Sequence, residues 1–293
     1  MRKQFVKTTE DLMAQDERLV LLLGDISVFG FRNVFKLYPE RIYNIGICEQ
    51  AMTSMAAGLA KEGLIPVLHS IAPFVVERCL EQLKVDFCYQ NMPGNIVSIG
   101  SSYDYAALGC THHCPGDVAS LRALPGMEIV VPGTPSEFDR LFRAAYANHH
   151  PTYFRLSERS NQESYEVEFG RAKVIQRGSL ATVIAVGPTL TRALEATKEL
   201  DVTILYYTTV APFDEDTLRE NCQREKIVLV EPYYAGVMVA DIHSALGYAS
   251  VIIKSMGVPR RFLTEYGYAE EHDEAIKLTQ ENIRAQVEEV IRV

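Results

Sequence analysis

Hydrophobic residues occur along the chain in short continuous runs that alternate with amphipathic segments. Runs that are apolar on both faces are typical of buried parallel strands, whereas apolar residues at every third or fourth position indicate helices. The runs predict strands at 18–23, 42–47, 65–68, 96–99, 128–132, 152–155, 181–186, 202–207, 227–231 and 250–253. The helical pattern falls at 5–16, 51–60, 74–90, 136–145, 190–199, 214–221, 236–246 and 279–292.

This alternation of strands and helices predicts an α/β protein whose parallel sheets are covered by helices on both faces. We expect two doubly wound domains, at 1–160 and 179–293, joined by a polar linker at 161–178. In open sheets of this kind, ligands bind beyond the carboxyl ends of the strands. Polar residues that follow a predicted strand are therefore the first candidates for a site.

Composition narrows the class of protein. The 293 residues are 47% hydrophobic and 23% charged, as in a packed globular protein. The net charge of -9 argues against nucleic-acid or anionic-membrane binding, which needs a basic surface, and no apolar run is long enough to span a membrane. Six scattered cysteines suit a reducing compartment, and the first residues resemble a helix start rather than a signal peptide. We expect a cytoplasmic location.

Glu49 stands between an apolar run and a helix rich in small residues. A glutamate at a helix start ordinarily stabilises the helix through its dipole, by roughly 0.3–1 kcal/mol. The alternative is a carboxyl group held in apolar surroundings, where it shares a proton with a ligand. Asp25, at the end of the run 18–23, is likewise either a turn or N-cap aspartate or a ligand contact. The local sequence leaves these alternatives open.

The polar, glycine-containing segment 100–116 is a long predicted loop, and loops of this length in compact domains are more often functional than not. Cys110 and Cys114 flank two histidines within it, but a second ligand pair at the spacing of a structural zinc site is missing. We therefore predict no metal site on this chain. The glycine-rich motifs of dinucleotide and nucleotide phosphate binding and the Gly-x-Ser-x-Gly elbow are absent from the sequence.

Five segments, in order along the chain, resemble the transketolase family of thiamine diphosphate enzymes. They are Arg41–Ala60 around Glu49, Cys110-Thr-His-His, Asp117–Arg122, Gly126–Gly133 and Ser157–Asn161. The second half, including Gly257–Phe262, resembles the carboxy-terminal domain of the family, so the resemblance covers nearly the whole chain. It implies a pyrimidine-binding domain followed by a transketolase C-terminal domain.

The family also has an amino-terminal domain in which a Gly-Asp-Gly motif and a downstream asparagine hold the metal. This chain has no Gly-Asp-Gly. The resemblance therefore implies one subunit of a split transketolase, with thiamine diphosphate as cofactor and with Mg²⁺ and the diphosphate held by a separate partner subunit. The implied reaction moves a two-carbon ketol unit between sugar phosphates. Because the cofactor must be closed in from the partner's side to exclude water, we expect a heterotetramer of two plus two chains.

The resemblance implies a role for each of five residues. Glu49 matches the glutamate that hydrogen-bonds the cofactor ring nitrogen N1′, and Phe74 matches the aromatic residue that stacks on the pyrimidine ring. Asp25 matches a strand-end acid near the cofactor, and Ile71 lies where the family often has a second aromatic residue. His112 matches the histidine that contacts the substrate near its reactive carbonyl or hydroxyl. Without the resemblance, Phe74 would be assigned to the core and His112 to a loop hydrogen bond.

Three further positions concern the substrate. Arg159 matches the arginine that binds the distal phosphate of a sugar phosphate, a role that suits a guanidinium group, although the inserted Glu158 and the nearby Arg155 leave open which arginine binds it. His69, in the loop before Phe74, is a supporting candidate at the substrate site. Leu108 stands where typical transketolases have an aspartate that recognises the acceptor hydroxyl, so an unusual sugar or acceptor is expected.

Two other functions remain open at this point. The β subunit of the decarboxylating component of a 2-oxo acid dehydrogenase shares the glutamate and also pairs with a separate diphosphate-binding chain. The Ala-Ser-Leu-Arg segment at 119–122 and Arg159 favour the transketolase. A non-catalytic partner that regulates or scaffolds another protein would not need Glu49, Phe74 and His112 together.

Overall fold

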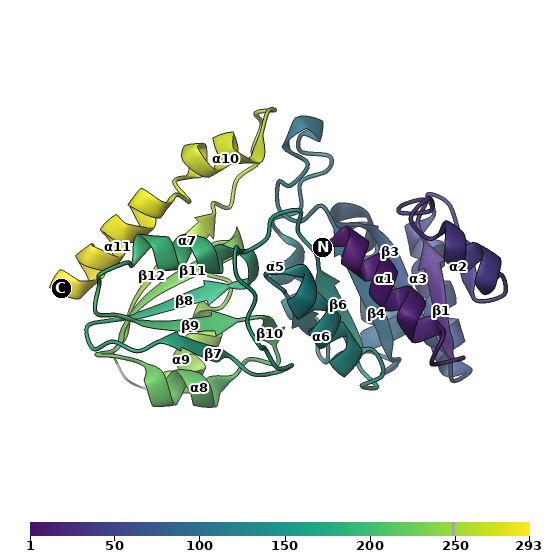
Figure 1. Cartoon of the computed structure of the whole chain (residues 1–293), viewed down its shortest axis with the longest axis horizontal. Helices are drawn as coiled ribbons and strands as arrows, with labels where there is room; N and C mark the ends of the chain where they lie inside the picture. The colour runs from purple at the N-terminus through teal and green to yellow at the C-terminus, as the bar shows by residue number, and fades with distance from the viewer. Residues whose placement is uncertain (248–249) are drawn as a thin grey trace.

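Two mostly parallel sheets form the frame of the molecule (Figure 1), in a computed structural model that describes residues 1–247 and 250–293. The first sheet has the strand order β10-β5-β6-β4-β3-β1-β2, in which β10 is antiparallel to its neighbour. Its strands are β1 Leu19–Leu23, β2 Ile42–Asn44, β3 Ile65–Ile71, β4 Gly94–Ile99, β5 Glu128–Val130, β6 Pro151–Arg155 and β10 Thr209–Ala211.

The second sheet has the order β12-β11-β8-β9-β7, in which β7 is antiparallel to β9. Its strands are β7 Lys173–Gln176, β8 Thr182–Val186, β9 Thr203–Tyr207, β11 Lys226–Tyr234 and β12 Ile252–Val258. Parallel strands need crossover connections, and helices supply them here. The predicted α/β class with two doubly wound sheets is confirmed.

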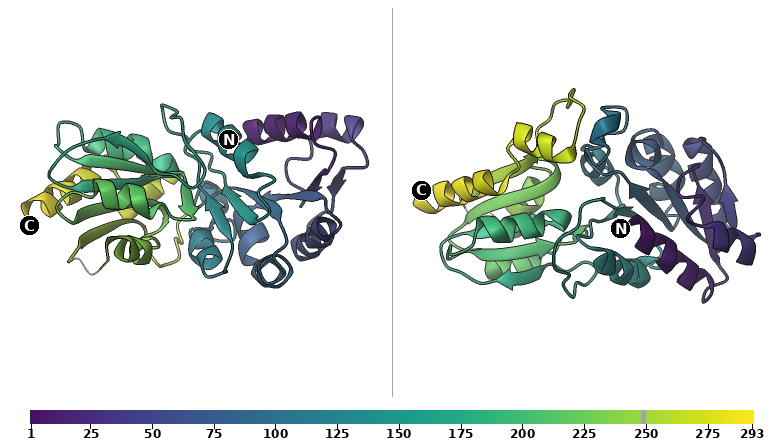
Figure 2. Two further views of the ribbon diagram at one scale, coloured as in Figure 1. Left: turned by 90° about the horizontal axis from the view of Figure 1, so that it is seen from below. Right: turned by 45° about the horizontal axis from the view of Figure 1, so that its top comes forward.

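Helices cover both faces of each sheet (Figure 2). They are α1 Arg2–Met13, α2 Arg32–Leu37, α3 Glu49–Lys61, α4 Leu80–Gln82, α5 Asp117–Arg122, α6 Pro135–Ala145, α7 Leu190–Ala196, α8 Glu215–Asn221, α9 Val239–Leu246, α10 Ala269–Ile276 and α11 Gln280–Arg292. On the first sheet, α1 and α6 pack together on one face, and α3 packs on the other. No helix in the described residues is both long and apolar enough to cross a membrane.

Two buried layers run along the opposite faces of both sheets. In β8, Val183 and Ala185 face the layer under α7 and α11, while the alternate residues Ile184 and Val186 face the layer under α8 and α9. This alternation follows from the period of two along a strand. Because both faces are buried, every residue of β8 is apolar except Thr182, which explains the continuous hydrophobic runs in the sequence.

The structure corrects four details of the predicted elements. The helix expected at 74–90 is divided into the π-helical turn η1 Pro73–Glu77, the short α4, and a second π-helical turn η2 Leu83–Cys88. The expected linker at 161–178 contains β7. Strand β10 belongs to the second half of the chain but pairs with β5 of the first sheet. Helices α2, α5 and α10 were not predicted; α2 and α5 have six residues each, fewer than two turns, which is too few to establish a period.

A buried polar network joins the two sheets. Glu137 on α6 is fully buried, and its carboxylate accepts hydrogen bonds from the hydroxyl of Tyr206 on β9 at 2.7 Å and from the backbone N–H of Gly133 at 2.9 Å. Asn161 donates to the Tyr206 hydroxyl at 3.2 Å. A Cβ at Gly133 would lie 2.1 Å from both Asn161 and Tyr206, so only glycine permits this close approach.

We predict that Tyr206→Phe lowers the free energy of unfolding by about 1–3 kcal/mol, because the buried Glu137 carboxylate loses a hydroxyl donor. Urea unfolding of the full chain measures the change. The matched control is Tyr43→Phe. The Tyr43 side chain is exposed and its hydroxyl donates to the Glu40 carbonyl, so this substitution should change the free energy of unfolding by less than about 0.5 kcal/mol. Equal effects of the two substitutions would contradict the proposed importance of this network.

Candidate cofactor site

The candidate site forms where β1 and β3 end at the same edge of the first sheet. The parallel register pairs Leu23 with His69, so Gly24 and Ser70 follow at the same level. A Cβ at Gly24 would lie 3.0 Å from the Ser70 Oγ and 3.3 Å from the Glu49 Cγ. The missing side chain of Gly24 therefore lets the start of α3 approach the strand ends.

Glu49 is the first residue of α3, and it is 1% exposed. Its Oε2 lies 2.6 Å from the Arg78 Nη1 in an ion pair, and its Oε1 accepts a hydrogen bond from the Ser70 hydroxyl at 3.2 Å. Glu49 is therefore buried, as one of the two alternatives required, and its carboxylate has polar partners. A buried carboxylate needs compensating charge or hydrogen bonds, and Arg78 and Ser70 supply both.

Phe74 and Arg78 both come from the segment that contains η1. The turn is closed by a hydrogen bond from the Arg78 N–H to the Pro73 carbonyl at 3.0 Å, a spacing of five residues. Such a turn is wider than an α-helical one, and π-turns are frequent at functional sites. The Arg78 guanidinium carbon lies 4.4 Å from the centre of the Phe74 ring, in a cation–π contact.

His112 lies on the other side of Phe74. The two rings are 5.3 Å apart and meet edge to face at 71°. The loop 100–116 that holds His112 is fastened by a β-bridge between Ser102 and Cys114. Glu49, Arg78, Phe74 and His112 therefore form a continuous row of contacts, which we call the Glu49 row.

Asp25 and Ile71 flank the Glu49 row. Asp25 has a left-handed φ of 57°, and its exposed carboxylate accepts a hydrogen bond from the Asn44 amide at 2.9 Å. Its neighbour Gly24 lies beside Glu49. Ile71 ends β3 and is nearly buried beside Gly100. Their assignment to the cofactor site stays a prediction.

His69 requires a correction, because it is fully buried and exposes no atom for a substrate. Its Nδ1 lies 2.8 Å from the Val97 carbonyl, which only accepts, so Nδ1 donates. Its Nε2 then accepts from the Ser27 hydroxyl at 2.7 Å, and Ser27 in turn accepts from Arg2 at 2.8 Å. From inside the core, His69 therefore links β3 to β4 through Val97 and to the segment after β1 through Ser27.

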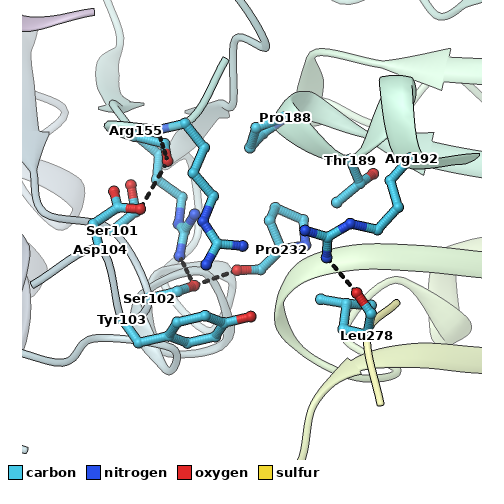
Figure 3. A pocket seen from close by; sticks show the side chains of 12 residues that line it. Ser101, Ser102, Tyr103, Asp104, Arg155, Pro188, Thr189, Arg192, Pro232 and Leu278 are labelled. Atoms are coloured by element: carbon cyan, nitrogen blue, oxygen red, sulfur yellow. Dashed lines mark hydrogen bonds between the residues drawn. The ribbon is translucent and has the colours of Figure 1, made fainter. Parts of the chain in front are cut away.

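Arg159 lies in a second cluster, between the two sheets. Its Nη1 is 2.9 Å from both carboxylate oxygens of Asp273 on α10, and Arg192 on α7 binds the same carboxylate at 2.8 Å. The Tyr103 hydroxyl donates to Asp273 at 2.5 Å, and the Arg159 guanidinium lies over the Tyr103 ring. Arg159, Arg192 and Tyr103 line a small cavity of about 40 Å³. Figure 3 shows Arg192 and Tyr103 at opposite sides of it.

The structure separates the roles of Arg155 and Arg159. Arg155 is 1% exposed and is held by Asp117, 2.7 Å from its Nε. Arg159 is partly exposed, and its Nη2 has no hydrogen-bond partner among the described residues. This Nη2 atom is itself buried, but the Arg159 side chain as a whole is 28% exposed, whereas Arg155 is closed to solvent. No hydrogen bond or ring contact among the described residues joins Arg159 directly to the Glu49 row.

Sequence reasoning missed Arg78, Ser70 and Asp273. Arg78 could have been found, because it follows Phe74 by four residues and so shares its side of a predicted helix. Ser70 follows a strand predicted to end at 68, beside the site. Asp273 has no comparable signal, because its contacts with Arg159 and Arg192 span more than eighty residues.

The donor set of the Glu49 row fits a planar, nitrogen-containing ring. A carboxylate binds a ring N–H or an amino group, and a phenyl ring provides a stacking surface. The described residues contain no group of three or more His, Cys, Asp or Glu side chains that would hold a metal ion. The fold and this row of side chains define an α/β protein with a candidate site at the strand ends of its first sheet, followed by a second α/β sheet.

Two models of known protein families match this chain. "Transketolase, pyrimidine binding domain" matches residues 1–163, and "Transketolase, C-terminal domain" matches residues 170–283. The chain therefore belongs to the transketolase family, as the five sequence segments predicted.

Individual relatives extend over nearly the full chain. An uncharacterized 33.6 kDa protein in the fasciation locus of Rhodococcoides fascians is 37% identical over 92% of this chain and 88% of its own length. An apulose-4-phosphate transketolase subunit of Actinobacillus succinogenes is 30% identical over 80% of this chain and 78% of its own length. A solved split-gene transketolase, an inactive β4 tetramer, has a TM-score of 0.86 and 25% identity, covering 99% of this chain and 97% of that chain.

We predict an acid-dependent loss of stability that depends on His69. Burial lowers the pKa of His69 to about 4, from an ordinary value of 6.5. The unfolded chain therefore takes up a proton near pH 6.5, whereas the folded chain does not until about pH 4. The contribution is fully present above pH 6.5 and is lost as the pH falls toward 4, by roughly 3 kcal/mol in total.

Urea unfolding at pH 7.5, 6, 5 and 4.2 measures this loss. The wild-type curve should fall relative to that of His69→Asn, because the amide has no proton to gain in this range. His149→Asn, at an exposed histidine, should keep the wild-type pH dependence. Parallel wild-type and His69→Asn profiles would contradict the prediction.

Proposed function

We propose that this chain is the carboxy-terminal subunit of a split transketolase. The assembled enzyme would move a two-carbon ketol unit between sugar phosphates. The observation that carries the proposal is the Glu49 row, in a chain whose family is defined by pyrimidine binding. Residues 1–160 would form the pyrimidine-binding unit and 179–293 the C-terminal unit. The intervening 161–178, which contains β7, would connect them.

The residues of the chain suit the cofactor thiamine diphosphate in this way. Glu49 would hold a proton against the N1′ position of the aminopyrimidine, and Phe74 would stack on the ring, with Ile71 and Asp25 at its margins. When bound, the cofactor supplies a carbon nucleophile that accepts the ketol unit. His112, at the edge of Phe74, would donate or accept a proton at the oxygen of the substrate.

A separate subunit would hold the diphosphate and Mg²⁺. Helix α3 and the turn η2 lie side by side, joined by a hydrogen bond from Ser54 to Asp86 at 2.6 Å. Both expose apolar side chains: Met55 on α3 is 51% exposed and Val85 on η2 is 38% exposed. Apolar exposure of this kind supports a protein partner on this side. The split-gene relative is inactive as a β4 tetramer, which supports the need for a second kind of chain. We propose that two chains of each kind assemble into a heterotetramer.

The substrate class follows from Arg159 and from the relatives. The Arg159 side chain is 28% exposed, so a phosphate could reach its guanidinium, and two relatives carry the name of an apulose-4-phosphate transketolase subunit. Leu108 is 51% exposed on loop 100–116 and offers no hydrogen bond to an acceptor hydroxyl. We propose a phosphorylated ketose donor and an acceptor that departs from that of the typical enzyme.

The deciding experiment mixes the purified chain with candidate diphosphate-binding subunits, thiamine diphosphate and Mg²⁺. Ketol transfer between sugar phosphates supports the proposal. Decarboxylation of a 2-oxo acid would assign the chain to the 2-oxo acid dehydrogenase β subunits instead. Stable complex formation without either reaction would indicate a regulatory or scaffolding chain.

We predict that Glu49→Gln lowers ketol transfer by the assembled enzyme at least about 100-fold, because the amide cannot exchange a proton with the cofactor ring. Initial rates at saturating substrate measure the effect. Glu62→Gln, the same change at the exposed far end of α3, should leave the rate unchanged. A rate for Glu49→Gln within threefold of wild type would contradict the role of Glu49 in proton exchange with the cofactor ring.

We also predict that Arg159→Gln raises KM for phosphorylated substrates about 10–100-fold, because one charged hydrogen bond to phosphate contributes roughly 1.5–3 kcal/mol. KM for an unphosphorylated analogue should stay constant. Arg140→Gln, at an exposed arginine paired with Glu166, is the control for loss of a surface charge. A parallel rise for both substrates would mean that the substitution only loosens the contact with Asp273.

A further inference from the structure

The guanidinium of Arg78 lies between the two groups that define the pyrimidine slot. It forms a 2.6 Å ion pair with Glu49 on one side, and its carbon atom is 4.4 Å from the centre of the Phe74 ring on the other. Glu49 is 1% exposed, whereas the Arg78 side chain is 35% exposed. The guanidinium of Arg78 therefore lies in the site while part of the side chain reaches solvent.

A guanidinium offers the same contacts as a protonated aminopyrimidine. Both are flat, both present N–H donors to a carboxylate in their own plane, and both stack on an aromatic face. A ring stacked on Phe74 and hydrogen-bonded to Glu49 would need the space that the Arg78 guanidinium fills between these two groups. Occupation of the slot by Arg78 and by a pyrimidine ring is therefore mutually exclusive.

We propose that Arg78 is an internal occupant of the pyrimidine slot and that its displacement sets the affinity of this chain for the cofactor. The proposal rests on the proposed function, because it takes Glu49 and Phe74 as the pyrimidine contacts. The exit needs only side-chain rotation toward solvent, since the backbone N–H of Arg78 stays bonded to Pro73 in η1. The ion pair also satisfies the buried Glu49 carboxylate until the cofactor arrives.

Isothermal calorimetry of the full chain with thiamine diphosphate tests the proposal. Arg78→Met keeps an unbranched apolar stem but removes the guanidinium with its charge and its donors, and it should bind the cofactor at least about tenfold more tightly than wild type. Millimolar guanidinium ion should compete with the cofactor in Arg78→Met and have little effect in wild type. Arg32→Met is the matched control, because Arg32 stacks on Phe29 at 4.5 Å and, within residues 1–247 and 250–293, its guanidinium donates only to the Phe29 carbonyl.

A second measurement does not depend on the folding of Arg78→Met. In the wild-type chain, NMR of the arginine side chains should show Arg78 N–H protons protected from exchange by Glu49. Saturating thiamine diphosphate should remove this protection while Arg155, buried with Asp117, stays protected. Persistent protection of Arg78 in the presence of bound cofactor would overturn the proposal.

The remaining outcomes separate this proposal from the proposed function. Equal or weaker binding by Arg78→Met, or no binding by either chain, overturns the role of Arg78 as an occupant. If wild type and Arg78→Met bind equally and Glu49→Gln abolishes binding, the pyrimidine site itself still stands. If Glu49→Gln also binds the cofactor equally, the result contradicts both the role of Arg78 as occupant and the role of Glu49 as a pyrimidine contact.

Discussion

The buried carboxylate of Glu49 is the constraint around which the site is built. A charge this far from water must be compensated, and in the isolated chain Arg78 and Ser70 compensate it. Everything near it follows from that requirement: Gly24 leaves room for the start of α3, and the widened turn η1 brings Arg78 over Phe74.

The same principle governs the second polar cluster. Arg159 and Arg192 come from different parts of the chain and share one carboxylate, Asp273, which lies on α10 of the second half. Loop 100–116 reaches both clusters, because Tyr103 binds Asp273 and His112 contacts Phe74. In Figure 1 this loop and the segment around α10 rise on the same side of the molecule. The loop is therefore the physical connection between the proposed cofactor contacts and the proposed phosphate contact.

The two sheets are held in one arrangement by polar contacts as well as by apolar packing. The carboxylate of Glu137 accepts a hydrogen bond from Tyr206, and β10 extends the first sheet with residues from the second half. Such contacts have specific geometry, so they restrict how the halves can rotate against each other. A fixed arrangement of the sheets also fixes the distance between Glu49, at the strand ends of the first sheet, and the arginine cluster between the two sheets.

The sequence by itself determined the α/β class, the strands buried on both faces and the family, because hydrophobic periodicity and short motifs are local properties of the chain. It also identified Glu49, Phe74 and His112, which the structure brings into one row. Only the tertiary structure decided that Arg78 pairs with Glu49, that His69 is buried, and that Asp273 holds Arg159. These facts depend on side-chain directions and on contacts between distant segments, such as β10 with β5, and neither is encoded in a local pattern.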